Sequence, residues 1–362
     1  MNPKLRFEPL KLELEPRPEW WRVRPEEIME LCRSVKRGRA EVIAETPAGF
    51  PVYAVFYGDF SEPAPRTNWS AAGSSSTYRS YYTREGAPQT FLFLAGIHGA
   101  EAESVCAAVN LIQLLETGRD FRGRRDEELL RLIEAYRLIV IPCANMDGRA
   151  ISPDHLRHAD DRTFRGASQG FWKNGKVIEW RESKQYFPLP LDEVAFPGGY
   201  PNSEGFNINH DAAPGHIRTA EARAILRLCE RWQVDAVLNG HSCEYGPALV
   251  RPSVLMYPAH QRRILSLTDR AAQRFYQAGL LPEPPPPAPG PAAPLNLDCM
   301  MTFASGALAV TLECSVGSTH DRYPFGSTYT FEQLAEPPFI LLKLMLADGL
   351  EAPFSDRAAI LR

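Results

Sequence analysis

Continuous apolar runs alternate with helix-like segments along most of the chain, and this alternation restricts the possible folds more than any other feature of the sequence. The runs Thr90-Phe-Leu-Phe-Leu-Ala-Gly96 and Arg137-Leu-Ile-Val-Ile-Pro142 are typical of strands that are buried on both faces. Segments with apolar residues at every third or fourth position lie between such runs and predict amphipathic helices. A chain that alternates in this way is expected to form an α/β sheet covered by helices on both faces.

The order of the expected elements predicts one domain. Strands are expected at residues 40–46, 52–57, 90–96, 137–142, 234–239 and 307–313. Helices are expected at residues 25–35, 101–115, 127–134, 219–232, 263–278 and 332–346. No linker separates these elements, so residues 1–362 are predicted to form a single-domain α/β/α sandwich with a mixed, mostly parallel twisted sheet.

Three stretches stand apart from this pattern. Residues 1–24 precede the first helix and are expected to form an N-terminal extension. Residues 149–206 are polar and show little periodicity, and a long loop insertion of this kind in a compact domain is usually functional or disordered. Residues 282–294 are rich in proline and are expected to form an extended surface strap.

The composition excludes several classes of partner. A formal net charge of −4 gives no electrostatic reason to expect nucleic acid or an anionic membrane. No window approaches the roughly 18 apolar residues of a membrane span, and the N-terminus lacks the apolar core of a signal peptide. The seven cysteines include no C-x-x-C pair, which indicates free thiols in a reducing compartment. A cytoplasmic location is therefore expected, and the oligomeric state stays open.

The first candidate site is the segment Gly96-Ile-His98-Gly-Ala-Glu101, which lies where a buried strand ends and a helix begins. Ligands of open α/β sheets bind at the carboxyl ends of the strands. A histidine and a glutamate three residues apart across a glycine-containing turn can reach one metal ion, and both suit Zn²⁺. The alternative is that Glu101 only stabilises the helix N-terminus and that His98 is an incidental loop residue.

Two further strand ends carry polar residues. The strand at 234–239 is followed by His241 and Ser242, so that His98, Glu101 and His241 would supply the three protein ligands of an open metal site. The strand at 307–313 ends in Glu313, a carboxylate that is costly to bury without a partner. Glu313 is therefore a candidate general base in a polar cleft, or else an ordinary edge carboxylate that pairs with an arginine.

Together these motifs resemble the zinc carboxypeptidases, the carboxypeptidase A family. The residues 46–52 look like the family's turn before its second strand. The segment 142–148 resembles its P-x-x-N-P-D-G segment, with Met146 in place of the second proline. The segment 206–211 falls where the family has N-x-N-R, and Glu221 and Ala222 open the helix that follows. These matches keep the family's order over roughly residues 25–350.

The resemblance implies roles for particular residues. Zn²⁺ would be held by His98, Glu101 and His241, and Glu313 would activate water and then protonate the leaving amine. Asn209 would form a hydrogen bond with a carboxylate or carbonyl of the substrate. The predicted function is therefore zinc-dependent hydrolysis of an amide or peptide bond in a small peptide or acyl-amino-acid substrate.

The chain departs from the family's pattern at the position that binds the substrate carboxylate. His210 directly follows Asn209, where the family has an arginine that holds the C-terminal carboxylate in two hydrogen bonds. Histidine offers fewer donors and titrates near neutrality, so an atypical substrate site is expected. Asp298 lies near the family's specificity pocket and could favour a basic group or belong to a plain turn.

The arginine that stabilises the oxyanion in this family should lie shortly after Gly148. Arg162 is the predicted counterpart, and other cations of the same region compete with it, namely Arg157, Arg165 and Lys173. The family's tyrosine that closes on the substrate has no clear counterpart.

Two other functions compete with this prediction. Gly96-Ile-His-Gly-Ala-Glu101 is also similar to the G-x-H-G-x-E segment of aspartoacylase and succinylglutamate desuccinylase, which remove acyl groups from N-acyl amino acids. The turn around Gly49 and the order of helices and strands favour the carboxypeptidase branch. The third possibility is a catalytically inert binding protein of the same fold, against which the intact Glu313 and metal ligands argue.

Overall fold

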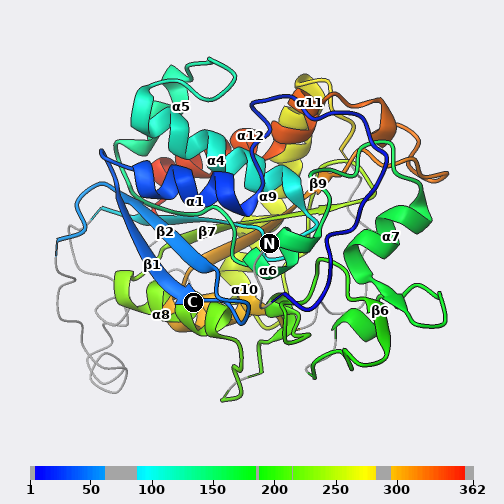
Figure 1. Ribbon diagram of the computed structural model, residues 1–362. Coiled ribbons are helices and arrows are strands. Elements are labelled where there is room, and N and C mark those ends of the chain that lie inside the picture. The colour runs from blue at the N-terminus through cyan, green and yellow to red at the C-terminus, as the bar shows by residue number, and fades with distance from the viewer. Residues whose placement is uncertain (1–4, 62–87, 185–186, 214, 283–294, 355–362) are drawn as a thin grey trace.

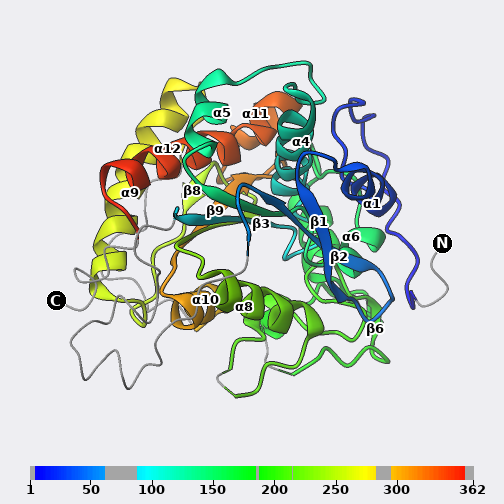
Figure 2. The ribbon, with the colours of Figure 1, turned by 90° about the vertical axis from the view of Figure 1, so that its left-hand side faces the viewer.

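The computed structural model describes residues 5–61, 88–184, 187–213, 215–282 and 295–354. Its largest sheet contains seven strands within these residues, namely β1 (Arg39–Glu45), β2 (Pro51–Tyr57), β3 (Thr90–Ala95), β4 (Arg137–Ile141), β7 (Ala236–Cys243), β8 (Ala248–Leu249) and β9 (Leu308–Ser315). They lie in the order β1-β2-β4-β3-β7-β9-β8. Figures 1 and 2 show this sheet between its covering helices.

The four central strands of this sheet are parallel. β4 pairs with β3, β3 with β7 and β7 with β9 in parallel, whereas β1, β2 and β8 are attached as antiparallel strands. The carboxyl ends of β3, β7 and β9 therefore meet at one edge of the sheet. This arrangement confirms the predicted mixed, mostly parallel sheet, and it brings the candidate ligands to a common edge.

Helices cover both faces of the sheet (Figure 2). One face packs against α1 (Pro25–Ser34), α4 (Ala102–Thr117), α5 (Glu127–Ile133), α11 (Phe331–Ala335) and α12 (Pro337–Glu351). The opposite face packs against α8 (Ala220–Trp232) and α10 (Leu297–Ser305), and α9 (Pro258–Gln277) lies beside β8 and α12. Apart from the edge strands β1 and β8, the strands are buried almost throughout because side chains on both faces pack into one continuous hydrophobic core. The predicted α/β/α sandwich is thus confirmed.

Several elements differ from the sequence prediction: α9 begins at Pro258 where a helix was expected from residue 263, and α10 was not expected. Two further differences have a local cause. β7 continues through His241 to Cys243, because the parallel partner β9 extends the ladder as far as Ser315. The expected helix at residues 332–346 is divided into α11 and α12 at Pro337. Pro337 and Pro338 lack the backbone N–H groups that would continue α11, but proline is well suited to the first turn of a new helix.

The long insertion at residues 149–206 contains short regular elements. These are the end of α6 (Met146–Ile151), α7 (Asp161–Gln169), β5 (Phe171–Trp172), the 3₁₀ turn η1 (Glu182–Lys184) and β6 (Val194–Phe196), and a second 3₁₀ turn, η2 (Ile208–His210), follows. Small clusters of buried side chains, such as Ile178 with Leu189 and Val194, fix this segment. Their scattered spacing explains why the sequence shows no periodicity there.

The two other unusual stretches have different outcomes. The described part of the N-terminal extension runs along the surface, where Leu10 and Leu12 pack against the small cluster around Phe164 and Phe7 packs near Ile178. The proline-rich strap lies outside the described residues except for Pro282. All seven cysteines are buried and unpaired. No helix among the described residues is long and apolar enough to cross a membrane.

Candidate metal centre and active site

The turn between β3 and α4 positions the first two candidate ligands. Gly96 has a φ of +63°, a conformation that favours glycine, and Glu101 is the residue before the first turn of α4. Gly99 lies so close to the backbone of Gly148 that a Cβ atom there would overlap it. The turn is closed by the bond from Gly99 N to the Gly199 carbonyl oxygen at 2.6 Å. The glycines thus allow the tight turn that directs His98 and Glu101 toward one point.

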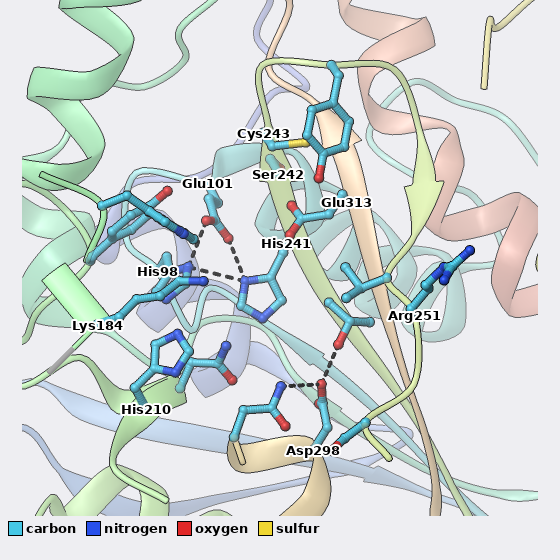
Figure 3. A pocket seen from close by; sticks show the side chains of 18 of the residues that line it. His98, Glu101, Lys184, His210, His241, Ser242, Cys243, Arg251, Asp298 and Glu313 are labelled. Carbon is cyan, nitrogen blue, oxygen red and sulfur yellow. Dashed lines mark hydrogen bonds and ion pairs between the residues drawn. The ribbon is translucent and has the colours of Figure 1, made fainter. Parts of the chain in front are cut away.

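His98, Glu101 and His241 converge at the sheet edge (Figure 3). Oε1 of Glu101 lies 2.7 Å from Nδ1 of His98, and Oε2 lies 2.9 Å from Nδ1 of His241. The two Nδ1 atoms are 3.2 Å apart. All three side chains are buried, and the possible ligand atoms of the group lie within 4.8 Å of one another. The geometry therefore brings together the three residues that the sequence predicts as metal ligands.

The chemistry of this donor set suits zinc. Two imidazole nitrogens and one carboxylate oxygen are common zinc ligands, and three protein ligands leave a coordination position open. Burial raises the pKa of Glu101, but the charges of His98 and His241 and their hydrogen bonds outweigh burial and lower this pKa to about 2. A carboxylate that is ionised while fully enclosed, with two imidazoles directed at it, is the environment that a divalent cation requires.

Glu313 lies directly opposite His241. The two residues are register partners in the parallel pair β7–β9, so their side chains leave the same face of the sheet. Oε2 of Glu313 is buried and has no hydrogen-bond partner among the described residues. Burial raises the pKa of Glu313 to about 8; His241 opposes this shift, and Glu101 and Glu244 add to it. A divalent cation at the neighbouring ligands would favour the carboxylate form.

Two residues outside the predicted set contact His98. The imidazole Nε2 lies 3.1 Å from Oδ1 of Asn207, which leaves Nδ1 directed at the metal position. The Tyr200 ring packs against the imidazole with a centroid distance of 4.2 Å. Asn207 could have been suspected from its place two residues before Asn209, but nothing in the sequence marks Tyr200.

The matched segment at residues 142–148 braces the site. The Asn145 side chain donates to the carbonyl oxygens of residues 199–201 and accepts from Gly148 N. Asp147 accepts hydrogen bonds from Thr46 and from the backbone of Ala48 and Ser203. These contacts join the turn at residues 46–52 to the loop that carries Tyr200, which explains why the two motifs occur together.

A cavity of about 750 Å³ opens beside the three candidate ligands and Glu313. Asn209 and His210 line it, as the sequence predicts for substrate-binding residues, and both are buried. Oδ1 of Asn209 is buried and has no hydrogen-bond partner among the described residues. Burial, together with the charges of Lys184, His98 and His241, lowers the pKa of His210 well below its usual range. His210 is therefore neutral in the absence of substrate.

The predicted oxyanion-binding cation, Arg162, does not line this cavity. Its guanidinium donates to the Gly175 carbonyl oxygen at 2.9 Å and lies 5.5 Å from the centroid of Phe171. The first turn of α7 directs Arg162 outward, whereas Arg165, one turn later, reaches the cavity and forms an ion pair with Glu244.

Other cations of the insertion also divide between the surface and the cavity. Arg157 donates to the Tyr329 carbonyl oxygen at 2.6 Å, and Lys173 is exposed. Lys184 lines the cavity although no sequence motif indicated it.

Asp298 lies at the far end of the cavity from Glu101 (Figure 3). Its carboxylate accepts hydrogen bonds from Asn239 at 2.8 Å and Asn296 at 3.1 Å, and also from the Thr311 hydroxyl. Asp298 therefore joins α10 to β7 and β9 and also presents a negative group to the cavity.

The fold and the site define a metal-dependent hydrolase. The sequence profile of the zinc carboxypeptidases matches residues 59–246, more than half of the chain. The chain belongs to the zinc carboxypeptidase family and is a metallocarboxypeptidase-like hydrolase. The cofactor of this family is Zn²⁺, and His98, Glu101 and His241 are a group of described residues that could hold it. No curated protein sequence matches the chain significantly.

Several solved structures share the fold. The metallo-carboxypeptidase from Burkholderia cenocepacia is 15% identical, with a TM-score of 0.55 over 90% of this chain and 69% of that one. The metallo-carboxypeptidase from Pseudomonas aeruginosa, in complex with (2-guanidinoethylmercapto)succinic acid, is 15% identical, with a TM-score of 0.53 over 90% and 68%. Bovine thrombin-activatable fibrinolysis inhibitor, in complex with tick carboxypeptidase inhibitor, is 12% identical, with a TM-score of 0.54 over 92% and 99%.

Proposed function

We propose that this hydrolase cleaves an amide bond of a small peptide or N-acyl amino acid, with His98, Glu101 and His241 as zinc ligands and Glu313 as the catalytic base. The observation that carries the proposal is the β7–β9 register, in which Glu313 lies opposite His241 and lines the same cavity as the other two ligands. Membership of the zinc carboxypeptidase family supports metal-dependent peptide hydrolysis. The zinc ligands and the base named above are our assignment of this chemistry to particular residues of this chain.

The reaction requires that a proton move from water to the leaving amine. His98, Glu101 and His241 would hold Zn²⁺, which would act as a Lewis acid on the scissile carbonyl and lower the pKa of water. Glu313 accepts one proton from the attacking water, whose oxygen forms a bond with the carbonyl carbon. Glu313 then gives this proton to the amine nitrogen as the C–N bond breaks, so that one water is consumed and an acid and an amine are released.

Arg165 is the better candidate for stabilising the oxyanion. It lines the cavity, whereas Arg162 donates to the protein backbone outside it. The ion pair with Glu244 fixes the Arg165 guanidinium beside the cavity and leaves some of its five N–H donors for a substrate oxygen.

The substrate end differs from the family's pattern because His210 replaces an arginine. A buried, neutral imidazole cannot form the two charge-assisted hydrogen bonds by which arginine holds a carboxylate. The Pseudomonas relative binds a succinic acid derivative, which carries two carboxylates, and this supports an acidic substrate group in the present chain as well. That group must then be recognised by another residue.

A substrate screen tests the proposal. Zinc-loaded protein is assayed with N-benzoyl dipeptides and with N-acetyl and N-succinyl amino acids, with and without a chelator. Chelator-sensitive cleavage of the dipeptides supports a peptidase, and cleavage of the acyl amino acids alone identifies a deacylase. If Glu313→Gln retains the activity of the wild type on its best substrate, the assignment of the base is wrong.

A further inference from the structure

Lys184 is a cation of the active-site cavity that neither the family's motifs nor the proposed mechanism uses. It ends the 3₁₀ turn η1 inside the long insertion and lines the cavity with Asn209 and His210. Its side chain extends toward His98 (Figure 3). The ammonium lies 3.9 Å from the centroid of the Trp180 ring, a cation–π contact that holds the charge beside the cavity.

The Lys184 ammonium forms no salt bridge and no hydrogen bond with the other described residues. Burial lowers the pKa of Lys184 to about 8, against the attraction of Glu313, so the side chain remains largely cationic at neutral pH. The side chain is only partly buried, but an ammonium at the wall of a cavity without a direct counter-ion attracts an anion that enters it.

The other cations near the cavity are placed differently. Arg165 forms an ion pair with Glu244. The Arg251 side chain extends away from His241 and Glu313 in Figure 3. His210 carries no charge before substrate binds because its pKa is far below neutrality. Lys184 is therefore the cation best placed to meet a negative group next to Asn209 and His210.

A hydrogen bond connects the Lys184 turn to the metal centre. Nδ2 of Asn207 donates to the carbonyl oxygen of Ser183, the residue before Lys184, at 2.8 Å. Oδ1 of the same Asn207 lies 3.1 Å from Nε2 of His98. One amide group thus contacts both a candidate zinc ligand and the turn that carries the ammonium, so His98 and the Lys184 turn are held relative to each other by direct contacts.

We propose that Lys184 binds a carboxylate of the substrate. It would take over the role of the arginine that the family carries at the position of His210. This inference rests on the proposed hydrolytic function. An ammonium is a compact charge without the planar fork of arginine, so it does not require one fixed carboxylate orientation. The site would therefore accept peptides or N-acyl amino acids whose carboxylate lies near the scissile bond, either at the α position or on a side chain.

The experiment compares two substrates that differ only in this group, N-benzoyl-glycyl-phenylalanine and its C-terminal amide. The zinc-loaded wild type, Lys184→Met and Lys184→Arg are assayed with both, and Lys176→Met, which removes an exposed lysine of the same insertion, is the matched control. Lys184→Met should lower the ratio of kcat/KM for the acid to kcat/KM for the amide by about 10- to 100-fold, mainly through KM, because one charged hydrogen bond is lost. Lys184→Arg should restore much of the ratio, and Lys176→Met should leave it unchanged.

Three results would overturn the inference. The first is an unchanged ratio in Lys184→Met. The second is an equal fall of kcat on both substrates, which would mean that Lys184 acts on the oxyanion. The third is a wild type that does not prefer the acid.

A binding measurement separates this inference from the proposed function. If the zinc-loaded wild type cleaves neither the dipeptides nor the N-acyl amino acids, the proposed function fails. Calorimetry with N-benzoyl-phenylalanine and N-benzoyl-phenylalaninamide then decides the role of Lys184. Tighter binding of the acid by the wild type, lost in Lys184→Met, supports the carboxylate site. Equal preference in both proteins, or no preference in the wild type, contradicts it.

Discussion

His98 and Asn207 form a hydrogen bond of 3.1 Å between Nε2 and Oδ1, across more than a hundred residues of sequence. The bond selects the tautomer of His98 in which Nε2 carries the proton and Nδ1 is free to bind a metal. The second half of the Asn207 amide donates to Ser183. Asn207 is therefore a positioning residue with two separable functions, and substitutions can remove one or both of them.

Asn207→Leu should weaken zinc binding about 10- to 100-fold, because the variant keeps the size of the side chain but cannot accept the His98 proton. Competition with a zinc chelator measures the change. Asn174→Leu, in an exposed turn of the insertion, is the control. Zinc affinity equal to that of the wild type in Asn207→Leu would show that the His98 orientation does not depend on this bond.

Asn207→Asp separates the two functions of the side chain. A carboxylate accepts the His98 proton at least as well as an amide does, so zinc affinity should not fall. A carboxylate cannot donate to the Ser183 carbonyl oxygen, so the turn that carries Lys184 should loosen and KM for a carboxylate substrate should rise. A zinc affinity that falls as far as in Asn207→Leu would contradict this division.

Removal of the metal should abolish activity and destabilise the fold. Ligand binding to the native state adds about 2.7 kcal/mol when free zinc is about 100 times its dissociation constant. Dialysis against a chelator should therefore lower the melting temperature in calorimetry, and added Zn²⁺ should restore both properties. In His241→Ala, neither the chelator nor added Zn²⁺ should change the melting temperature or the activity. His216→Ala, at an exposed position, should respond as the wild type does.

Glu313→Gln should lower kcat by about 10²- to 10⁴-fold while zinc content stays at the level of the wild type, since an amide cannot accept the proton of water. Kinetics and metal analysis of the same preparation check both parts. Glu134→Gln, at an exposed position, controls for the loss of one charge. A variant that retains zinc and full activity would remove Glu313 from the mechanism.

Glu221 should make the stability of the fold depend on pH. This side chain is buried at the start of α8, where Oε1 accepts from Asn202 at 3.2 Å and burial raises its pKa to about 7. Between about pH 4.5 and 7, the Glu221 carboxyl is protonated in the native state and ionised in the unfolded chain. The free energy of unfolding therefore falls as the pH rises through this range.

Glu221→Gln removes this penalty. The variant should exceed the wild type by about 3 kcal/mol in free energy of unfolding at pH 8, and the two should converge below about pH 4.5. Urea unfolding at both pH values measures the difference. Glu204→Gln, at an exposed neighbouring position, should show no comparable gain, and equal stabilities of wild type and Glu221→Gln at pH 8 would disprove the account.

Gly99→Ala should disturb the metal site through the backbone. A Cβ atom at this position overlaps Gly148 and Arg149, so the turn between His98 and Glu101 must move, at a cost of about 1–3 kcal/mol or more. Both zinc affinity and unfolding free energy should fall. Gly123→Ala is the comparison, because its Cβ would meet no atom within 4 Å although its φ of +77° is unfavourable for alanine. Equal effects of the two substitutions would exclude the steric explanation.

The fold was predictable because its signals are local. The apolar run at residues 90–96 and the run at 137–142 mark buried strands without reference to the rest of the chain, and the helices between them show their own periodicity. The break between α11 and α12 at Pro337 also has a local signal, because Pro337 and Pro338 lack backbone N–H groups. The prediction of one helix at residues 332–346 was wrong because it followed the apolar pattern through these prolines.

The site was predictable as far as it lies at strand ends. His98 and Glu101 follow β3, and His241 and Glu313 lie near the carboxyl ends of β7 and β9. Because the carboxyl ends of parallel strands meet at one edge, the sequence alone was enough to bring these residues together. Their exact pairing required the register, which depends on hydrogen bonds between strands far apart in the sequence.

The insertion at residues 149–206 shows what only the tertiary structure decided. Arg162 and Lys184 are both cations of this segment, yet one donates to the surface backbone and the other lines the cavity. The path of the segment is set by small clusters of buried side chains and by single bonds such as that from Asn207 to Ser183, and these leave no periodic pattern. The sequence therefore determined the sheet and the residues at its edge, whereas only long-range packing decided which cation faces them.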